Sequence, residues 1–245
     1  MRKKLDLDNL DLNRAYTKEE LKIINNNLKV QTNFENERLI PIPQNPIAKE
    51  AIIQEISRQL GNWNIQTGQG GLVTTSQGGF NFSASNRRNK IIAPDIAFTP
   101  DTTYITLNQK QLWSFNGQPF TPIFVVEVAV VTSDAILNAI DNRMKNDYFA
   151  INTSVKLGWI IDPMNIIWVY KKENNEKFPT RHKCDWDDLD GGNVLPGFTL
   201  EISKINDIML LGDDDEVEEG EKCPYCDSIL NSVFNMMRHM KKMHN

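Results

Sequence analysis

The feature that most constrains the fold is the run from Ile123 to Val131, which is nearly continuous in apolar, mostly β-branched residues. Alternating polarity would indicate a strand with one face in water, whereas a continuous apolar run is typical of a strand buried on both faces. Helices usually provide the cover on both faces of such a sheet. The run therefore predicts the central strand of a layered α/β domain.

Helical periodicity appears on either side of that run. Apolar residues recur at helical spacing from Ile47 to Leu60, and Gly61 follows as a helix end. A capping box from Thr17 to Glu20 opens a shorter helix. A further helix is expected from Asp134 to about Asn152, with an apolar stripe formed by Ile136, Ile140, Met144 and Tyr148.

The other strands are marked by β-branched residues between turn signals. Residues 61–98 contain the glycine turns of a β-meander, and residues 157–161 and 166–170 form two strands around an Asp162-Pro163 turn. The polar stretch 172–192 indicates a surface loop. Together these patterns predict a mixed β-sheet flanked by helices. Three tryptophans are expected in its core: Trp113, Trp159 and Trp168.

An acidic run divides the chain. Residues 213–221 hold seven acids and no base, and such a run repels itself and stays extended. We therefore expect an N-terminal helical extension over 1–29, a main domain over 30–212, a linker over 213–221 and a small module over 222–245. Before the linker there are 23 bases and 24 acids, so the net charge of −5 does not exclude a nucleic-acid partner.

Membrane insertion and secretion are not expected. No run approaches the roughly 18 apolar residues that a spanning helix needs, and the start of the chain lacks the apolar stretch of a signal peptide. Three cysteines are too few for a disulfide framework. We expect an intracellular protein, in the nucleus or the cytoplasm, with no membrane partner.

The strongest motif lies in the C-terminal module. Cys223-Pro-Tyr-Cys226 is followed by twelve residues, His239, four more residues and His244. Two thiolates and two imidazoles at this spacing supply the tetrahedral ligands of a Cys2His2 zinc site. A module this short cannot fold on its apolar core alone, so zinc would order it as a ββα finger. The alternative is chance spacing in an unfolded tail.

The partner of the finger stays open between nucleic acid and protein. By resemblance to DNA-reading fingers, Ser232, Asn235 and Arg238 would face the bases, because asparagine pairs with adenine and arginine with guanine. One finger covers only about three base pairs, which is a weak site on its own. A run of methionines suits a protein contact equally well: Met236, Met237, Met240 and Met243.

Two carboxylates form a second constellation. Glu127 stands inside the most apolar strand, where an ionised carboxylate without a partner is very costly. Asp95 follows Pro94 at the start of another strand. A metal held by both acids would compensate their charge, and oxygen ligands favour Mg²⁺ or Mn²⁺. Alternatively, Glu127 forms a structural pair with a lysine or an arginine, and Asp95 only begins a turn.

Six short segments follow one another between residues 30 and 210. They are Gly79 to Phe82 with Ala93 to Phe98, Phe124 to Val128, Ser133-Asp134, the helix with Arg143, Lys145 and Tyr148, Val155 to Pro163, and Leu195 to Leu200. In this order they resemble the restriction endonuclease family common in cyanobacteria, part of the PD-(D/E)xK nuclease superfamily. The resemblance implies a restriction-endonuclease-like sheet, Mg²⁺ or Mn²⁺ held by Asp95 and Glu127, and phosphodiester hydrolysis in DNA.

The chain departs from the superfamily pattern at one position. The superfamily lysine stands two residues after the second acid, where this chain has Ala129. The substitute on the next helix is Lys145 by residue type, with Arg143 as the alternative by register. We predict a metal-dependent endodeoxyribonuclease with Asp95, Glu127 and Lys145 as catalytic residues. A catalytically decayed domain that binds nucleic acid or protein is the alternative, and the sequence does not define the oligomeric state.

Overall fold

The computed structural model describes residues 17, 19–20, 32–35, 38–41, 45–82, 90–114, 118–164, 166–173, 176–210, 220–230 and 233–244. Most of the expected N-terminal extension and acidic linker lies outside these residues, as does Ser232. The predicted capping box is present: the Thr17 amide donates to the Glu20 carboxylate at 3.0 Å, and the Glu20 amide donates to the Thr17 hydroxyl at 3.2 Å.

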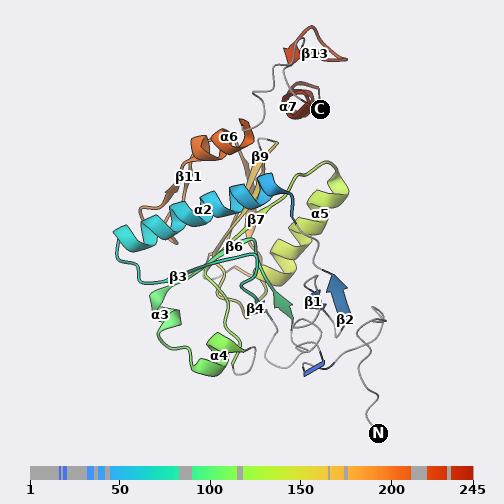
Figure 1. Cartoon of the computed structure of the whole chain (residues 1–245). Coiled ribbons are helices and arrows are strands. Elements are labelled where there is room, and N and C mark those ends of the chain that lie inside the picture. Colours follow the sequence, from blue (N-terminus) through green and yellow to red (C-terminus); the bar gives the residue numbers. More distant parts are fainter. Residues whose placement is uncertain are drawn as a thin grey trace.

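A six-stranded mixed sheet forms the centre of the main domain (Figure 1). Its order is β10-β9-β8-β7-β6-β3, with β7 and β8 parallel and the other neighbours antiparallel. β7 carries the apolar run and is buried along its whole length, as predicted. The strands are β3 (Leu72–Thr75), β6 (Ile96–Thr99), β7 (Phe124–Val128), β8 (Leu157–Asp162), β9 (Ile166–Lys171) and β10 (Thr180–Cys184).

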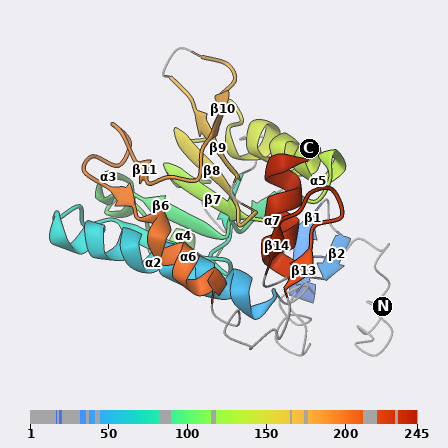
Figure 2. The same ribbon diagram turned by 90° about the horizontal axis from the view of Figure 1, so that it is seen from above.

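Helices cover both faces of the sheet (Figure 2). On one side lie α2 (Ile47–Gln66) and α6 (Ile202–Leu210), and on the other lies α5 (Asp134–Arg143), which continues into the π-helical turn η1 (Met144–Tyr148). Alternate side chains of β7 enter the two cores, because successive residues of a strand point to opposite faces. The predicted mixed sheet flanked by helices is confirmed.

Shorter elements complete the described part of the chain. β13, β14 and α7 form the predicted ββα unit at the C-terminal end. No described helix has both the length and the apolar character needed to cross a membrane. The bounds are β1 (Thr32–Glu35), β2 (Arg38–Pro41), β4 (Phe80–Asn81), β5 (Ile91–Ile92), α3 (Asp101–Tyr104), α4 (Gln109–Trp113), β11 (Leu189–Asp190), β12 (Thr199–Leu200), β13 (Glu221–Lys222), β14 (Ile229–Leu230) and α7 (Val233–Met243).

Two predicted helix ends were wrong. α2 passes through Gly61 and ends at Gln66, because Trp63 extends the buried stripe and its indole nitrogen donates to the Pro196 carbonyl at 3.1 Å. This packing outweighs the roughly 1 kcal/mol by which glycine disfavours a helix. The helix that follows Glu127 ends at Tyr148 rather than near Asn152, and its last turn, from Met144, is π-helical.

Three expectations about strands and core were also wrong. The described residues between 61 and 98 form no meander, since β3 pairs with β6 while β4 and β5 pair separately. The predicted loop contains β10, an edge strand whose exposed polar side chains give it the composition of a loop. Trp113 is 84% exposed at the end of α4, whereas Trp159 and Trp168 are buried as predicted.

Candidate active site

Asp95 directly precedes β6, and Glu127 lies in the neighbouring strand β7. β6 and β7 run antiparallel with Ile96 opposite Val126, so one further step in register places Asp95 opposite Glu127. Directly opposed residues point to the same face of a sheet. That face is the one covered by α5 and η1, and each acid is only 7% exposed. Two acids that came from separate motifs therefore share one site.

Two donors hold Asp95. The Val128 amide donates to its Oδ2 atom at 2.8 Å, and the Lys49 ammonium lies 3.1 Å from the same oxygen. Lys49 belongs to the first turn of α2 and was missed in the sequence. A signal was present, because Lys49 stands three and four residues before the buried Ile52 and Ile53, on the apolar stripe of the helix.

Glu127 is held by two groups from the helix that follows it. The Tyr148 hydroxyl donates to Glu127 Oε1, and Arg143 Nη1 lies 3.5 Å from the same oxygen. In a regular α-helix, side chains five positions apart point about 140° away from each other. The π turn, in which the Phe149 amide donates to the Met144 carbonyl at 2.9 Å, brings Arg143 and Tyr148 to one acid.

The electrostatics of Glu127 favour additional positive charge beside it. Burial and the neighbouring Asp95 raise the pKa of Glu127, and the opposing effects of Arg143, Tyr148 and Lys49 do not cancel the increase. Burial and the charge of Glu127 also raise the pKa of Tyr148 well above its ordinary value, so its hydroxyl remains a donor. An acid in this condition is typical of a functional site.

The donor set fits a hard divalent cation. Among the described residues, no donor bonds to Asp95 Oδ1 or Glu127 Oε2, which leaves one oxygen of each carboxylate for another ligand. Carboxylate oxygens are the preferred ligands of Mg²⁺ and Mn²⁺. The two acids could therefore hold such an ion between β6 and β7.

Lys145, the cation predicted for this site, lies elsewhere. Its ammonium is 2.7 Å from Asp141, which also accepts hydrogen bonds from Tyr170 at 2.7 Å and Arg181 at 2.9 Å. Residues two apart on a helix point about 200° away from each other, so Lys145 and Arg143 face different surroundings. Of the two candidates, the structure brings Arg143 to Glu127.

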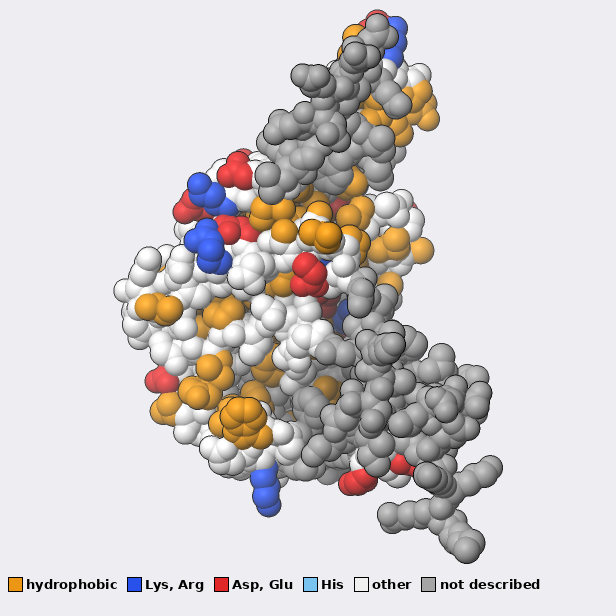
Figure 3. Space-filling view, viewed as in Figure 1, with side chains coloured by type: hydrophobic (Ala, Val, Ile, Leu, Met, Phe, Trp, Pro, Cys, Tyr) orange, Lys and Arg blue, Asp and Glu red, His pale blue; other side chains and the backbone are white. Residues whose placement is uncertain are grey.

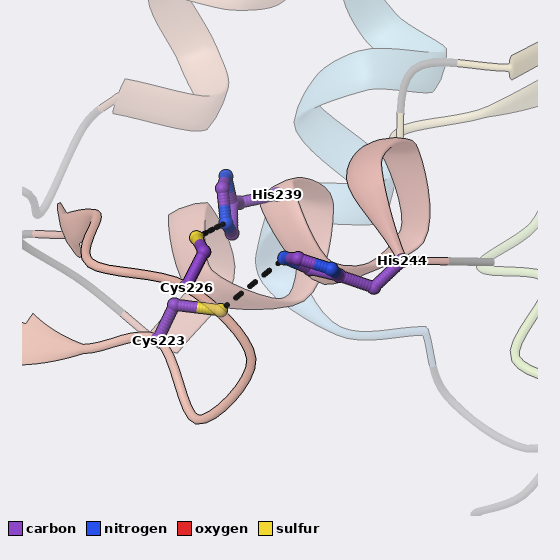
Figure 4. Close-up of side chains that lie close together, drawn as sticks. All are labelled: Cys223, Cys226, His239 and His244. Carbon is purple, nitrogen blue, oxygen red and sulfur yellow. Dashed lines mark hydrogen bonds between the residues drawn. The ribbon is translucent and has the colours of Figure 1, made fainter.

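The four predicted zinc ligands converge in the C-terminal module (Figure 4). Cys223 and Cys226 come from the loop between β13 and β14, and His239 and His244 come from α7 and its C-terminal end. Their ligand atoms lie within 4.8 Å of one another, with 3.0 Å from Cys226 to His239 and 3.6 Å from Cys223 to His244. Ligand atoms around tetrahedral zinc are about 3.3–3.8 Å apart, so shifts of about 1 Å or less would let these four side chains bind one zinc ion.

The surroundings of Cys226 favour its thiolate form. The Ser228 hydroxyl lies 3.3 Å from the sulfur, and hydrogen bonding by Ser228, followed by His244 and His239, lowers the pKa of Cys226 to about 6. The thiolate is the form that binds zinc. Two of the predicted base-reading residues, Asn235 and Arg238, lie on α7, are half-buried and already have interaction partners.

Comparison with known proteins decides the family of the main domain. The profile of the Uma2 family, described as "putative restriction endonuclease", matches residues 18–203. The chain belongs to the Uma2 family. The Uma2 region contains Asp95 and Glu127 and ends before the Cys2His2 module.

A solved structure supports the same fold. It is a "putative nuclease belonging to DUF820" from Anabaena variabilis ATCC 29413, with 14% sequence identity and a TM-score of 0.52, and the match covers 75% of this chain and 93% of that chain. No curated protein matches the chain. The Uma2 domain therefore has a restriction-endonuclease-like nuclease fold.

The exposed cations of the Uma2 domain differ in their surroundings. On the face shown in Figure 3, the visible Lys and Arg side chains are few and scattered, and those at the upper left lie beside acidic ones. Around α5 and η1, by contrast, the side chain of Arg143 is 50% exposed, and those of Lys145 and Arg181 are each 37% exposed. Of these three cations, Arg143 is paired with an acid of the site, whereas Lys145 and Arg181 are paired with Asp141.

Proposed function

We propose that this chain is a Mg²⁺-dependent endonuclease that hydrolyses phosphodiester bonds in DNA. The observation that carries the proposal is the pair of opposed, buried acids, Asp95 and Glu127, each with one oxygen left for a metal. Membership of the Uma2 family supports the reaction class. The half-exposed side chain of Arg143 beside Glu127 supports a polyanionic substrate, since phosphate contacts dominate binding to nucleic acid.

In this proposal the residues of the site divide the work. Asp95 and Glu127 would hold Mg²⁺, which when bound activates water and stabilises negative charge on the phosphate. The Tyr148 hydroxyl fixes the orientation of Glu127. Arg143 pairs with Glu127 and is exposed enough to bind a phosphate oxygen as well. Because a guanidinium stays protonated, Arg143 anchors charge and transfers no proton.

The test is cleavage of supercoiled plasmid and of linear and branched oligonucleotides by the full chain. We expect nicking with Mg²⁺ or Mn²⁺, none with EDTA, and none by Asp95→Asn in either metal. DNA binding without cleavage of any substrate by the wild type would instead favour the decayed nuclease. The observation that favours this alternative is that, within the described residues, the cation paired with Glu127 is an arginine, Arg143, rather than a lysine.

We also propose that the C-terminal module is a zinc finger that contacts nucleic acid or protein and folds separately from the main domain. The convergence of Cys223, Cys226, His239 and His244 supports zinc as the ion. Metal analysis of the full chain should find about one zinc per chain, lost in Cys226→Ser. The unfolding transition of the main domain should stay unchanged in that variant. Zinc retained in Cys226→Ser, or aggregation of the variant, would contradict the ligand set or the separate folding.

A further inference from the structure

Each buried acid of the site is paired with its own cation. The two cations belong to helices that cover opposite faces of the sheet. Arg143 reaches Glu127 from the side of α5, at 3.5 Å. Lys49 reaches Asp95 from α2, at 3.1 Å. The acids thus lie between an arginine and a lysine that are far apart in the sequence and attached to different layers of the fold.

The position of Lys49 is unusual for a side chain with only a packing role. The amide groups of the first turn of a helix carry partial positive charge, which disfavours a cation there. Lys49 stands in that turn of α2 and on the core-facing stripe, and its side chain is only 28% exposed. The ion pair with Asp95 therefore holds the ammonium against an unfavourable dipole.

Lys49 supplies a kind of donor that Arg143 does not. An ammonium is a compact charge with three rotatable hydrogens, whereas a guanidinium is a fixed planar fork. The ammonium of Lys49 forms an ion pair with Asp95 Oδ2. Its rotatable hydrogens can also point to an oxygen atom next to Asp95, which is where a phosphate group held at the two acids would lie.

We propose that Lys49 is a further catalytic residue of the site, which stays on Asp95 and donates a hydrogen bond to a non-bridging oxygen of the scissile phosphate. The inference rests on the proposed function, because it requires a phosphodiester substrate at the two acids. In this arrangement Arg143 and Lys49 neutralise the phosphate from two sides. Lys145, paired with Asp141, takes no part.

Lys49 should weaken metal binding but accelerate cleavage. Without DNA, the ammonium repels a metal ion at Asp95, so the zinc-loaded Lys49→Ala protein should bind Mn²⁺ at least as tightly as the wild type in calorimetry. At saturating metal, cleavage by Lys49→Ala should fall about 100-fold, the usual loss when one donor to a developing charge is removed. Lys49→Arg should recover part of the rate, and the matched control Lys145→Ala should stay within about threefold of the wild type.

The outcomes separate a catalytic from a structural lysine. Wild-type cleavage by Lys49→Ala at saturating metal would show that Lys49 only balances Asp95, and would overturn the proposal. Loss of cleavage together with weaker Mn²⁺ binding would assign Lys49 a structural role and overturn it too. If Lys49→Ala does not fold, Lys49→Met, which keeps the aliphatic stem, takes its place.

A separate measurement decides the inference if the wild type cleaves no DNA and the proposed function fails. Ca²⁺ replaces Mg²⁺, and the affinity for an uncleaved DNA duplex is compared. Lys49→Ala should weaken this affinity about tenfold, as expected for one charged hydrogen bond, while Lys145→Ala should leave it close to that of the wild type. Equal affinities for the wild type and Lys49→Ala would overturn the role of Lys49 at the phosphate.

Discussion

Two clusters built from the same kinds of groups lie beside the helix formed by α5 and η1. In each cluster, a buried carboxylate accepts a hydrogen bond from a tyrosine hydroxyl and forms an ion pair with an arginine. A lysine lies nearby. The first cluster contains Glu127, Tyr148, Arg143, Asp95 and Lys49. The second contains Asp141, Tyr170, Arg181 and Lys145.

The clusters differ in charge balance, and their acids respond in opposite ways. Burial raises the pKa of Asp141, but hydrogen bonds from Lys145 and Tyr170 and the charge of Arg181 outweigh burial, so the pKa is lowered overall. Glu127 and the adjacent Asp95 have one cation each, whereas Asp141 has two, and the pKa of Glu127 is raised overall by burial and by Asp95. An acid with enough cations stabilises the fold, whereas an acid with too few is suited to bind one.

The largest expected effect is the difference in cleavage rate between substitutions of Glu127 and of Asp141. Glu127→Gln should lower the cleavage rate about 1,000-fold, because it removes a metal-binding oxygen. Its melting temperature without metal should be unchanged or higher, since one of two crowded acids is gone. Asp141→Asn should cleave within about threefold of the wild type. Comparable losses of cleavage in both variants would remove the functional distinction between the clusters.

The next effect concerns the two cations of the helix. Arg143→Ala should lower cleavage about 100-fold, because it removes charge beside Glu127. Lys145→Ala should change cleavage little, since its ammonium serves Asp141. The sequence predicted the reverse order. If Lys145→Ala abolishes cleavage and Arg143→Ala does not, the helix must turn during catalysis, and Lys145 is the catalytic residue as the sequence predicted.

The sequence favoured Lys145, whereas the structure places Arg143 beside Glu127, and this difference shows which structural features can be predicted from a sequence. The zinc ligands and the buried strand depend on residues close together in the chain, so spacing alone predicts them. Asp95 and Glu127 were found for a similar reason, because each stands out within its own segment. The π turn at Met144 has no such signature, since helical periodicity assumes 3.6 residues per turn, yet this turn places Arg143 and Tyr148 on Glu127.

Features that depend on long-range placement were not predictable in the same way. Lys49 meets Asp95 only because α2 packs across the sheet, although a lysine on an apolar stripe was a usable hint. The pairing of β3 with β6 replaces an expected meander, and the edge strand β10 has too little burial to show a strand pattern. Local periodicity predicts which segments form elements, whereas tertiary packing decides which elements become neighbours.

The smallest effect tests whether the second cluster stabilises the fold through the charge of Asp141. Because the pKa of Asp141 is lowered below its ordinary value of 3.8, its contribution to the free energy of unfolding is present above pH 3.8 and disappears as the pH falls through the lowered pKa. The groups that face it are Lys145 from η1, Tyr170 from β9 and Arg181 from β10.

Asp141→Asn should therefore lower the free energy of unfolding by about 2 kcal/mol at pH 6, because a buried charged acceptor is lost. The estimate is at the low end for a buried pair, since Lys145 and Arg181 are each 37% exposed and water screens them. Urea unfolding of both proteins should show a similar difference at pH 6 and 4.5 and a smaller one at pH 3. A difference that stays constant would mean that the shape of Asp141, rather than its charge, stabilises the cluster, and the contrast with Glu127 would then not be electrostatic.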